Sequence, residues 1–425
     1  MAIRDLSMQR SMKLAAELCR RSRRNYSKFS LDEPVFPGID MEKVISEYSK
    51  GSASKYTLSD LTRLGRPPIS SEELLGNALV LKHEILCSLA QRAIALRNLP
   101  YIVMLNPNIS QIYLKYLASI SFVYGSRHEL ASTPAAENQA LVQAFEKMVA
   151  EHTDAIPVLA KGIDEAKNYI SSRRATEFLD THLRARLGIR LAAKHHIMLS
   201  QQSEQPDLNR ASFIGMVDTQ LRPAELCQTI ASLLADVSDL QYGVRPTIEI
   251  ERGKDITGIY VSEHLEYILT ELLKNSFRAT IEHSVGDTPA ARATAAEDSK
   301  PADVSTKLHG SVPLIPVQIT ITRSGDLVQI RIRDRGGGIP SAQLEKIWKY
   351  SESTFEEDDR DQGFKTINTP PPSVTGTGGS SMGGLGYGLP LSKAYAEYFG
   401  GKIELESIFG WGTDAYVTIR CPEAI

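Results

Sequence analysis

Residues 262–282 read SEHLEYILTELLKNSFRATIE, and this stretch decides how the second half of the chain is expected to fold. Apolar residues recur every three or four positions, which predicts an amphipathic helix with Ser262 as its N-cap. Glu271 and Asn275 are four positions apart and Arg278 follows three later, so these polar side chains share one face. The apolar positions are Leu265, Ile268, Leu269, Leu272, Leu273 and Phe277.

The polar face of this helix carries groups suited to chemistry on phosphates. An amide oxygen such as that of Asn275 is a hard neutral ligand, which Mg²⁺ accepts together with phosphates and water. A carboxylate such as that of Glu271 can orient or deprotonate a hydroxyl group or water. The same spacing also fits a solvated surface stripe, so the helix alone leaves both interpretations open.

A predicted hairpin ends in a second group of polar and glycine residues. Segments 316–323 and 327–334 alternate apolar and polar residues around a Ser-Gly pair, which predicts two antiparallel strands. The second strand ends at Asp334, and three glycines begin at Gly336. Glycines let the backbone approach a flat ligand closely, and the carboxylate can accept from an exocyclic amine such as adenine N6. A simple glycine-rich turn is the alternative.

The densest glycine run, GGSSMGGLGYGLP, covers residues 378–390 and precedes a helix expected to begin near Pro390. Backbone N–H groups in such a loop, and a helix N-terminus, favour phosphate. The run contains no Gly-Lys-Ser/Thr and no strand precedes it, so neither a Walker loop nor a dinucleotide fingerprint is expected. In the later turn at 410–414, Thr413 could hydrogen-bond toward Asp334 or a water beside it.

Helical periodicity dominates the first half of the chain, from about 40 to 205. Four amphipathic helices with short links predict an antiparallel bundle. They are expected at 72–98, at about 110–123, at 138–171 with an interruption near Pro157, and at 174–201.

The second half, from about residue 215, alternates helices and strands. A strand, a helix, a hairpin, a helix and a second hairpin in this order predict an α/β sandwich with a mixed sheet. Residues 285–313 are rich in Ala, Ser, Thr, Asp and Pro, which indicates a flexible insertion. The strands and helices outside the hairpin described above are expected at 246–251, 262–282, about 390–399, 401–407 and 413–420.

Composition indicates a globular protein and excludes several other classes. Of the 425 residues, 42% are hydrophobic and 23% are charged, and the net charge of −3 gives no support to a nucleic-acid partner. No apolar run approaches the roughly 20 residues that span a membrane. The 4 cysteines are too widely spaced for a CxxC pair, which favours free thiols over disulfides or zinc.

The first 30 residues are basic, contain serine and have few acids. This composition is typical of a mitochondrial transit segment. A basic tail or a native first helix would have the same composition, so these alternatives stay open.

Taken together and in order, the four motifs E-x-x-x-N, D-x-G-x-G, G-x-G-x-G and G-T resemble the boxes of the GHKL ATP-binding superfamily. The resemblance implies a Bergerat-type α/β sandwich after the helical bundle. It also implies that Asn275 holds Mg²⁺ against the triphosphate, that Asp334 binds adenine, and that residues from about 352 to 388 form the ATP lid. A K⁺ ion near the lid is a further expectation from the superfamily.

A closer resemblance links the chain to the mitochondrial protein kinases of 2-oxoacid dehydrogenase complexes. It rests on ELLKNSFRATIE, RDRGGGIP, GLGYGLPLSKAYAEYFGG and GWGTDAY, and on LPYIVMLNPNI and FLDTHLRARLGIR in the bundle, and it covers about residues 50–421. It implies a serine kinase of the mitochondrial matrix that inactivates the dehydrogenase subunit of such a complex. It also implies docking on the lipoyl domain of the acyltransferase core, and a homodimer.

The family resemblance assigns roles to individual residues. Glu271 is expected to activate the substrate hydroxyl, and Lys274 is expected to lie near the phosphates. Arg186 and Arg190, one turn apart, are expected to bind an inhibitory 2-oxo acid through its carboxylate, although exposed salt bridges would explain them too. The residues expected to bind the nucleotide are Asn275, Arg278, Asp334, Gly336, Gly338, Gly384, Leu385, Gly386, Tyr387, Gly388, Leu389 and Thr413.

Two substrates are possible within this family, and we expect the branched-chain complex, with pyruvate dehydrogenase as the alternative. Tyr267 stands where the pyruvate dehydrogenase kinases of the family carry histidine, and the chain lacks their long C-terminal tail. The Arg186–Arg190 segment and the pair His195-His196 favour the same substrate. The insertion and the acidic stretch at 352–361 fit neither form.

Functions of other classes remain as alternatives. An ATP-gated binding module would regulate the complex by occupancy without phosphate transfer. A two-component histidine kinase would need a phosphoaccepting histidine. No acid follows the pair His195-His196, so we interpret both histidines as structural.

Overall fold

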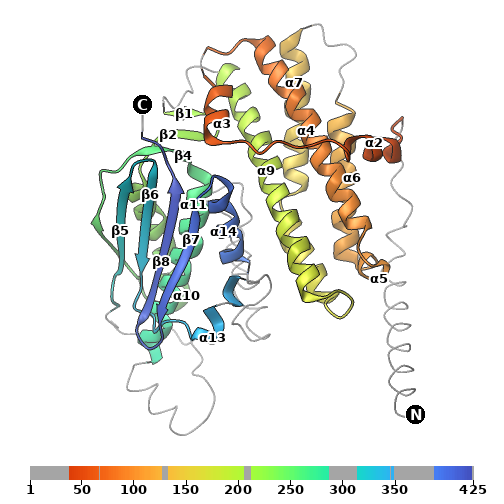
Figure 1. Ribbon diagram of the computed structural model, residues 1–425. Coiled ribbons are helices and arrows are strands. Elements are labelled where there is room, and N and C mark those ends of the chain that lie inside the picture. The colour runs from red at the N-terminus through yellow and green to blue at the C-terminus, as the bar shows by residue number, and fades with distance from the viewer. Residues whose placement is uncertain are drawn as a thin grey trace, which may run out of the picture.

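The computed structural model describes residues 38–66, 68–126, 133–204, 212–286, 314–344, 346–348 and 387–423. A helical part and a part built on a β-sheet lie side by side (Figure 1). The predicted transit segment, most of the insertion and most of the lid lie outside the described residues. Val285 and Gly286, the first two residues of the expected insertion, belong instead to the end of helix α11.

The helical part contains the predicted bundle, with three short helices that the periodicity did not indicate. Ser70 and Glu73 form a reciprocal capping box at the start of α4, and Asn106 caps α6. The expected interruption lies at 152–154, just before Pro157, which is tolerated because it stands in the first turn of the next helix. The helices are α2 (Met41–Tyr48), α3 (Leu58–Leu64), α4 (Ser71–Arg97), α5 (Tyr101–Met104), α6 (Pro107–Tyr124), α7 (Pro134–Glu151), α8 (Ala155–Glu165) and α9 (Ser172–Glu204).

The second part is a five-stranded mixed sheet with helices packed on one face (Figure 1). Its strand order is β3-β5-β6-β8-β7, where the β3–β5 pair is parallel and the other pairs are antiparallel. Alternate residues of β5 and β6 are buried beneath the helices, as the alternating pattern predicts. The strands are β3 (Ile248–Arg252), β5 (Val317–Ser324), β6 (Leu327–Arg333), β7 (Lys402–Ile408) and β8 (Gly412–Arg420), and the helices are α10 (Pro223–Tyr242), α11 (Ser262–Gly286) and α14 (Gly388–Tyr398).

A second, small sheet joins the two parts. Its order is β1-β2-β4, and Val217 pairs with Val261, the residue that precedes helix α11. Helix α9 of the bundle packs directly against α14. Its strands are β1 (Phe213–Ile214), β2 (Val217–Leu221) and β4 (Gly258–Val261), and two short helical turns, α13 (Ser341–Leu344) and η2 (Lys346–Trp348), follow the large sheet's central hairpin.

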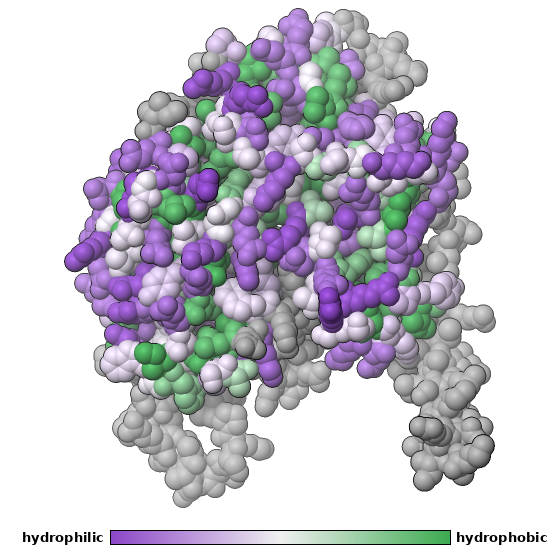
Figure 2. Space-filling model, in the orientation of Figure 1, coloured by the Kyte–Doolittle hydropathy of each residue, from purple (hydrophilic) through white to green (hydrophobic). Residues whose placement is uncertain are grey.

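Hydrophilic residues dominate the face of the molecule seen in Figure 2, with apolar residues scattered among them. Among the described helices, none is long and apolar enough to cross a membrane. The buried residues of both parts form one continuous hydrophobic cluster. The bundle and the sheet part are therefore packed together, so a change at α9 can reach α11 and α14 through side-chain contacts.

Candidate active site

Glu271 points into the protein from the middle of α11, with only 3% of its surface exposed. The ammonium group of Lys274, one turn later, lies 2.7 Å from each of its two carboxylate oxygens. A buried carboxylate needs such a partner, because transfer of an unpaired charge out of water is costly. The arrangement excludes a purely solvated stripe at this position and holds the carboxylate beside a cation.

The other polar residues of this helix lie differently. Asn275 is exposed, so its amide is open to a ligand outside the helix. The guanidinium of Arg278 is paired with Glu282, one turn further along α11. Of the predicted polar face, the structure therefore brings Glu271 and Lys274 together and leaves the Asn275 side chain accessible beside them.

Asp334 lies at the end of β6, where it is 5% exposed. Its Oδ1 accepts hydrogen bonds from the backbone N–H groups of Gly336 (2.9 Å) and Thr413 (3.1 Å). Burial raises the pKa of this carboxyl above its usual value, although the two backbone hydrogen bonds and a hydrogen bond with the Ser276 side chain each lower that pKa. The predicted link between Thr413 and Asp334 is present, but the backbone makes it rather than the hydroxyl.

The glycines after Asp334 are required by close packing. A Cβ at Gly336 would lie 2.4 Å from the Cβ of Ala279 on α11, so the loop can rest directly on the helix. Gly338 has φ of +70°, and a Cβ there would lie 2.2 Å from the carbonyl oxygen of Ile408. The Asp334 loop is thus fixed between α11 and the β7–β8 turn.

The serine of strand β7 is a site residue that sequence reasoning missed. The Ser407 hydroxyl accepts from the backbone N–H of Ile339 at 2.7 Å and lies 2.9 Å from the Thr413 hydroxyl. No motif marks this serine, because it contributes through cross-strand proximity alone. Its effect is to tie the glycine loop to the Thr413 turn.

The start of α14 meets helix α11. A Cβ on Gly388 would lie 2.1 Å from the Oε2 of Glu271, so a side chain at this position would force the carboxylate to shift. Tyr387, just before it, is buried, and Leu389 is partly buried. Gly384, Leu385 and Gly386 lie outside the described residues. The last residues of the expected lid and the expected base are therefore neighbours.

Tyr267 belongs to the packing between α11 and α14. It is 5% exposed, its ring lies 4.9 Å from that of Tyr395, and its hydroxyl has no hydrogen-bond partner among the described residues. Burial and the neighbouring Glu271 raise its pKa well above the usual value. Tyr267 is therefore part of the packing between these two helices.

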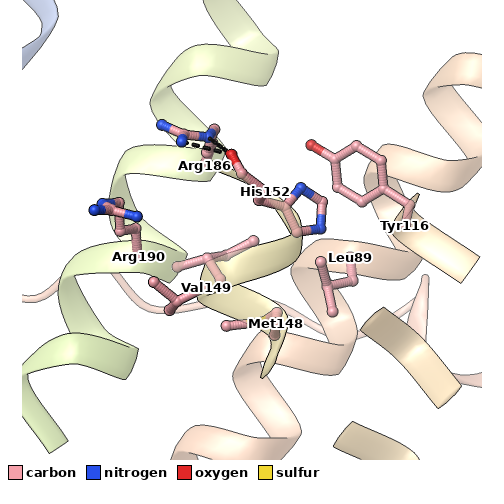
Figure 3. Close-up of a pocket in the computed structure, with 8 residues that line it drawn as sticks. Leu89, Tyr116, Met148, Val149, His152, Arg186 and Arg190 are labelled. Carbon is pink, nitrogen blue, oxygen red and sulfur yellow. Dashed lines mark hydrogen bonds between the residues drawn. The ribbon is translucent and has the colours of Figure 1, made fainter. Parts of the chain in front are cut away.

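Arg186 and Arg190 line one narrow pocket in the bundle (Figure 3). Nη2 of Arg186 donates to the carbonyl oxygen of His152 at 2.7 Å, and Nε donates to the same oxygen at 3.2 Å. Burial, the nearby Arg186 and Lys115 lower the pKa of His152 to about 3, so the imidazole is neutral at pH 7. Sequence reasoning missed this histidine, which reaches the pocket from the break after α7.

The two adjacent histidines of α9 are both buried within the bundle. Nε2 of His195 lies 3.1 Å from the carbonyl oxygen of Leu61, and Nε2 of His196 lies 2.9 Å from Oδ1 of Asn138. Burial lowers the pKa of each to about 4. Their surroundings fit the structural role inferred from the sequence.

Comparisons with known proteins agree with the order of these elements. Residues 55–218 match the family model described as mitochondrial branched-chain alpha-ketoacid dehydrogenase kinase. Residues 260–425 match the model of histidine kinase-, DNA gyrase B- and HSP90-like ATPases. The first match covers helices α3 to α9 and strand β1, and the second covers the motifs around Glu271 and Asp334.

Curated relatives match almost the whole chain. The [pyruvate dehydrogenase (acetyl-transferring)] kinase 1 of Saccharomyces cerevisiae is 28% identical, over 93% of this chain and 91% of the relative. The corresponding kinase of Arabidopsis thaliana is also 28% identical, over 88% of this chain and 93% of the relative. The human isozyme 1 is 26% identical over 80% of this chain and 72% of the relative.

These relatives do not support the expected preference for the branched-chain complex, because the curated ones named here are pyruvate dehydrogenase kinases. In the structure, Tyr267 and the two histidines of α9 are buried in the interior. The alternative, pyruvate, fits better. The chain is an ATP-dependent protein kinase and belongs to the mitochondrial 2-oxoacid dehydrogenase kinase family, within the GHKL superfamily.

Proposed function

We propose that this kinase phosphorylates a serine of the dehydrogenase subunit of the pyruvate dehydrogenase complex and thereby inactivates the complex. The observation that carries the choice of substrate is the alignment with pyruvate dehydrogenase kinases along 93% and 88% of the chain. The mitochondrial names of these relatives support a mitochondrial location, for which we infer the matrix. Docking on the lipoyl domain of the acyltransferase core and assembly as a homodimer belong to the same proposal.

In the proposed mechanism, Glu271 accepts the proton of the substrate hydroxyl as that oxygen attacks the γ-phosphorus of ATP. The bond between this phosphorus and the oxygen that bridges it to the β-phosphate breaks, and ADP leaves. The carboxylate must first lose at least one of its two contacts with the Lys274 ammonium. The phosphates of ATP offer that ammonium a stronger anionic partner. Lys274 would then stabilise negative charge on the phosphates, while Glu271 is free to act as base.

The nucleotide would lie along α11, between the Asp334 loop and α14. Asp334 would accept from the adenine amine, and Gly336, Gly338 and Thr413 would shape the pocket around it. The residues that would lie along the phosphates are Gly384, Leu385, Gly386, Tyr387, Gly388 and Leu389. The exposed amide oxygen of Asn275 suits Mg²⁺, whose chemistry when bound is to neutralise phosphate charge. Arg278 would contact phosphate after leaving Glu282, and a K⁺ ion near the lid completes the proposal.

Arg186 and Arg190 would hold the carboxylate of an inhibitory 2-oxo acid. Arg186 has carbonyl oxygens as its partners, so a carboxylate would be a better acceptor for its guanidinium. The pocket has a volume of about 20 Å³, which is room for little more than one water molecule. Binding of an acid therefore requires Arg186 to move away from His152.

Parallel assays on two purified complexes test the proposed substrate. Labelled phosphate from Mg-ATP is expected to reach the dehydrogenase subunit of the pyruvate complex, and only weakly that of the branched-chain complex. Preferred labelling of the branched-chain subunit would restore the expectation drawn from the sequence. In the same assay, unchanged transfer by Asn275→Ala would show that the metal assignment is wrong.

A further inference from the structure

Residues 51–57, here called the strap, connect α2 with α3 and cross the bundle without regular secondary structure (Figure 1). Helix α4 holds the strap at both ends. Gln91 donates to the carbonyl oxygen of Gly51 at 2.7 Å, and the Tyr56 hydroxyl donates to Glu84 at 2.5 Å. The two anchors are seven residues apart on α4, or roughly 10 Å along the helix. The strap therefore forms an arch over α4.

A cavity of about 320 Å³ lies beneath the strap, enclosed by α4, α9 and α14. This volume lies within the range of small-molecule sites, roughly 300–1,000 Å³, and far exceeds that of the Arg186 pocket. Its apolar walls include Leu81, Ile85, Ile189 and Ala192. We call it the arch cavity.

Ser88 is an unexplained polar group in the wall of the arch cavity. It lies between the two anchor residues Glu84 and Gln91 on the same face of α4 and is only 7% exposed. Its hydroxyl has no hydrogen-bond partner among the described residues. The Ser88 oxygen is not fully shut off from solvent, so it is open to the cavity without a protein partner. A ligand in the cavity would supply one.

Two charged groups around the arch cavity have no partner of opposite charge among the described residues. The Glu84 carboxylate accepts from the neutral Tyr56 hydroxyl, and the exposed Lys55 ammonium lies 5.2 Å from the centre of the Tyr398 ring. Arg184, by contrast, is held by Asp180 at 2.8 Å and Glu397 at 2.7 Å. The cavity thus combines an apolar interior with a carboxylate at one anchor of the strap and a positive charge at its edge, where an anionic head group can lie.

We propose that the arch cavity is a second ligand site, which binds a small amphipathic carboxylate. The carboxylate would face Lys55, the apolar chain would lie between Ile85 and Ile189, and the Ser88 hydroxyl would donate to an oxygen of the ligand. This site is separate from the Arg186 pocket, which lies on the other side of Ile189, the apolar residue that both share.

The arch cavity is also in contact with the helix that leads to the active site. Ala394 and Tyr398 of α14 line it, and a backbone group of Tyr56 hydrogen-bonds with the Tyr398 hydroxyl. The other end of the same 11-residue helix lies against Glu271 through Gly388. A ligand beneath the strap would therefore alter the position of α14 and the rate of phosphate transfer. This last step rests on the proposed function, whereas binding itself does not.

Calorimetry on the full chain tests the site with three probes that share an eight-carbon chain: octanoate, octanol and octylammonium. Octanoate is expected to bind at least tenfold more tightly than the other two, because only its head group can pair with Lys55. Lys55→Gln should weaken octanoate binding about tenfold or more, while Lys43→Gln, an exposed lysine on α2, should not change it. Ala192→Phe, which fills the cavity, should abolish it.

Arg186→Met serves to separate the two pockets. Octanoate binding that survives this substitution supports the arch cavity, whereas binding lost with Arg186 would place the ligand in the other pocket and overturn the proposal. Equal binding of all three probes, no binding at all, or indifference to Lys55→Gln would also overturn it. Binding without any effect on phosphate transfer would refute only the coupling through α14, and inactivity toward both dehydrogenase complexes would refute the proposed function alone.

Discussion

Arg186 in the bundle and Glu271 in the sheet part are both charged groups held inside the protein, but they are held in opposite ways. The guanidinium of Arg186 bonds to carbonyl oxygens of His152 and Thr153, and no carboxylate of the described residues is paired with it. The carboxylate of Glu271 is paired with Lys274 through both oxygens.

The difference in pairing determines which chemistry each group suits. A cation held by neutral acceptors gains a great deal from an incoming anion, which suits a binding pocket. A carboxylate that already has a cation can become a free base only when another anion takes that cation, which suits a site that must wait for ATP. Substitutions at these residues and their partners test this contrast.

Glu271→Gln should have the largest effect, because it removes the proposed base while keeping the shape of the side chain. We expect phosphate transfer to fall by about 10²–10⁴-fold. The measurement is transfer of labelled phosphate to the dehydrogenase subunit. Glu282→Gln, an exposed change on the same helix, is the control and should retain most of the activity. Comparable activity of the two variants would contradict the role of Glu271.

Lys274→Met should destabilise the protein, because it leaves the buried Glu271 carboxylate without its cation. We expect the free energy of unfolding to fall by about 3 kcal/mol, as when one partner of a buried pair is removed. Denaturant unfolding at pH 7 measures this. If the double variant Lys274→Met with Glu271→Gln is no more stable than Lys274→Met alone, the unpaired charge is not the cause.

Arg186→Met should leave the fold and basal transfer nearly intact but remove inhibition by pyruvate. Loss of a charge-assisted contact predicts an inhibition constant raised about tenfold or more. Arg184→Met is the matched control, since Arg184 lies on the same helix but pairs with Asp180 and Glu397 on the surface. If Arg186→Met is inhibited as strongly as the wild type, this pocket is not where the inhibitor binds.

The neutral state of His152 predicts a smaller, pH-dependent effect. Its folded pKa of about 3 lies below the value of about 6.5 expected in the unfolded chain. The unfolded state therefore binds a proton that the folded state does not, and stability is lost as pH falls from about 6.5 toward 3. Between pH 6.5 and 5.5, the wild type should lose about 1 kcal/mol more than His152→Gln, measured by urea unfolding. Parallel losses in both proteins would contradict this.

Apolar periodicity predicted most of the main elements of both parts, but it left helix α10 without a prediction. Helices α4, α9 and α11 begin or end within a few residues of the predicted limits, and the strands of the β5–β6 hairpin lie within one residue of theirs. Local patterns determine such elements, because each buries one continuous face. The small sheet escaped prediction because its strands are very short and Val217 pairs with Val261, more than forty residues later.

The candidate site shows a sharper limit of sequence reasoning. The spacing of Glu271 and Asn275 places them on one side of a helix, but it does not tell that the first is buried and the second exposed. Helix α14, more than a hundred residues away in the sequence, lies against Glu271 with Gly388 at the contact. Likewise, the contact between Tyr267 and Tyr395 is a tertiary property, so the sequence alone does not show that Tyr267 is enclosed.

The central claim is that the enzyme inactivates its complex by phosphate transfer and not by occupying it. The most direct measurement is the activity of the purified pyruvate dehydrogenase complex after incubation with Mg-ATP and equal, saturating amounts of wild type or Glu271→Gln. The account predicts that the wild type inactivates the complex and leaves acid-stable phosphate on serine, while the variant leaves the complex active. Equal inactivation by both proteins would contradict it and favour an ATP-gated binding module.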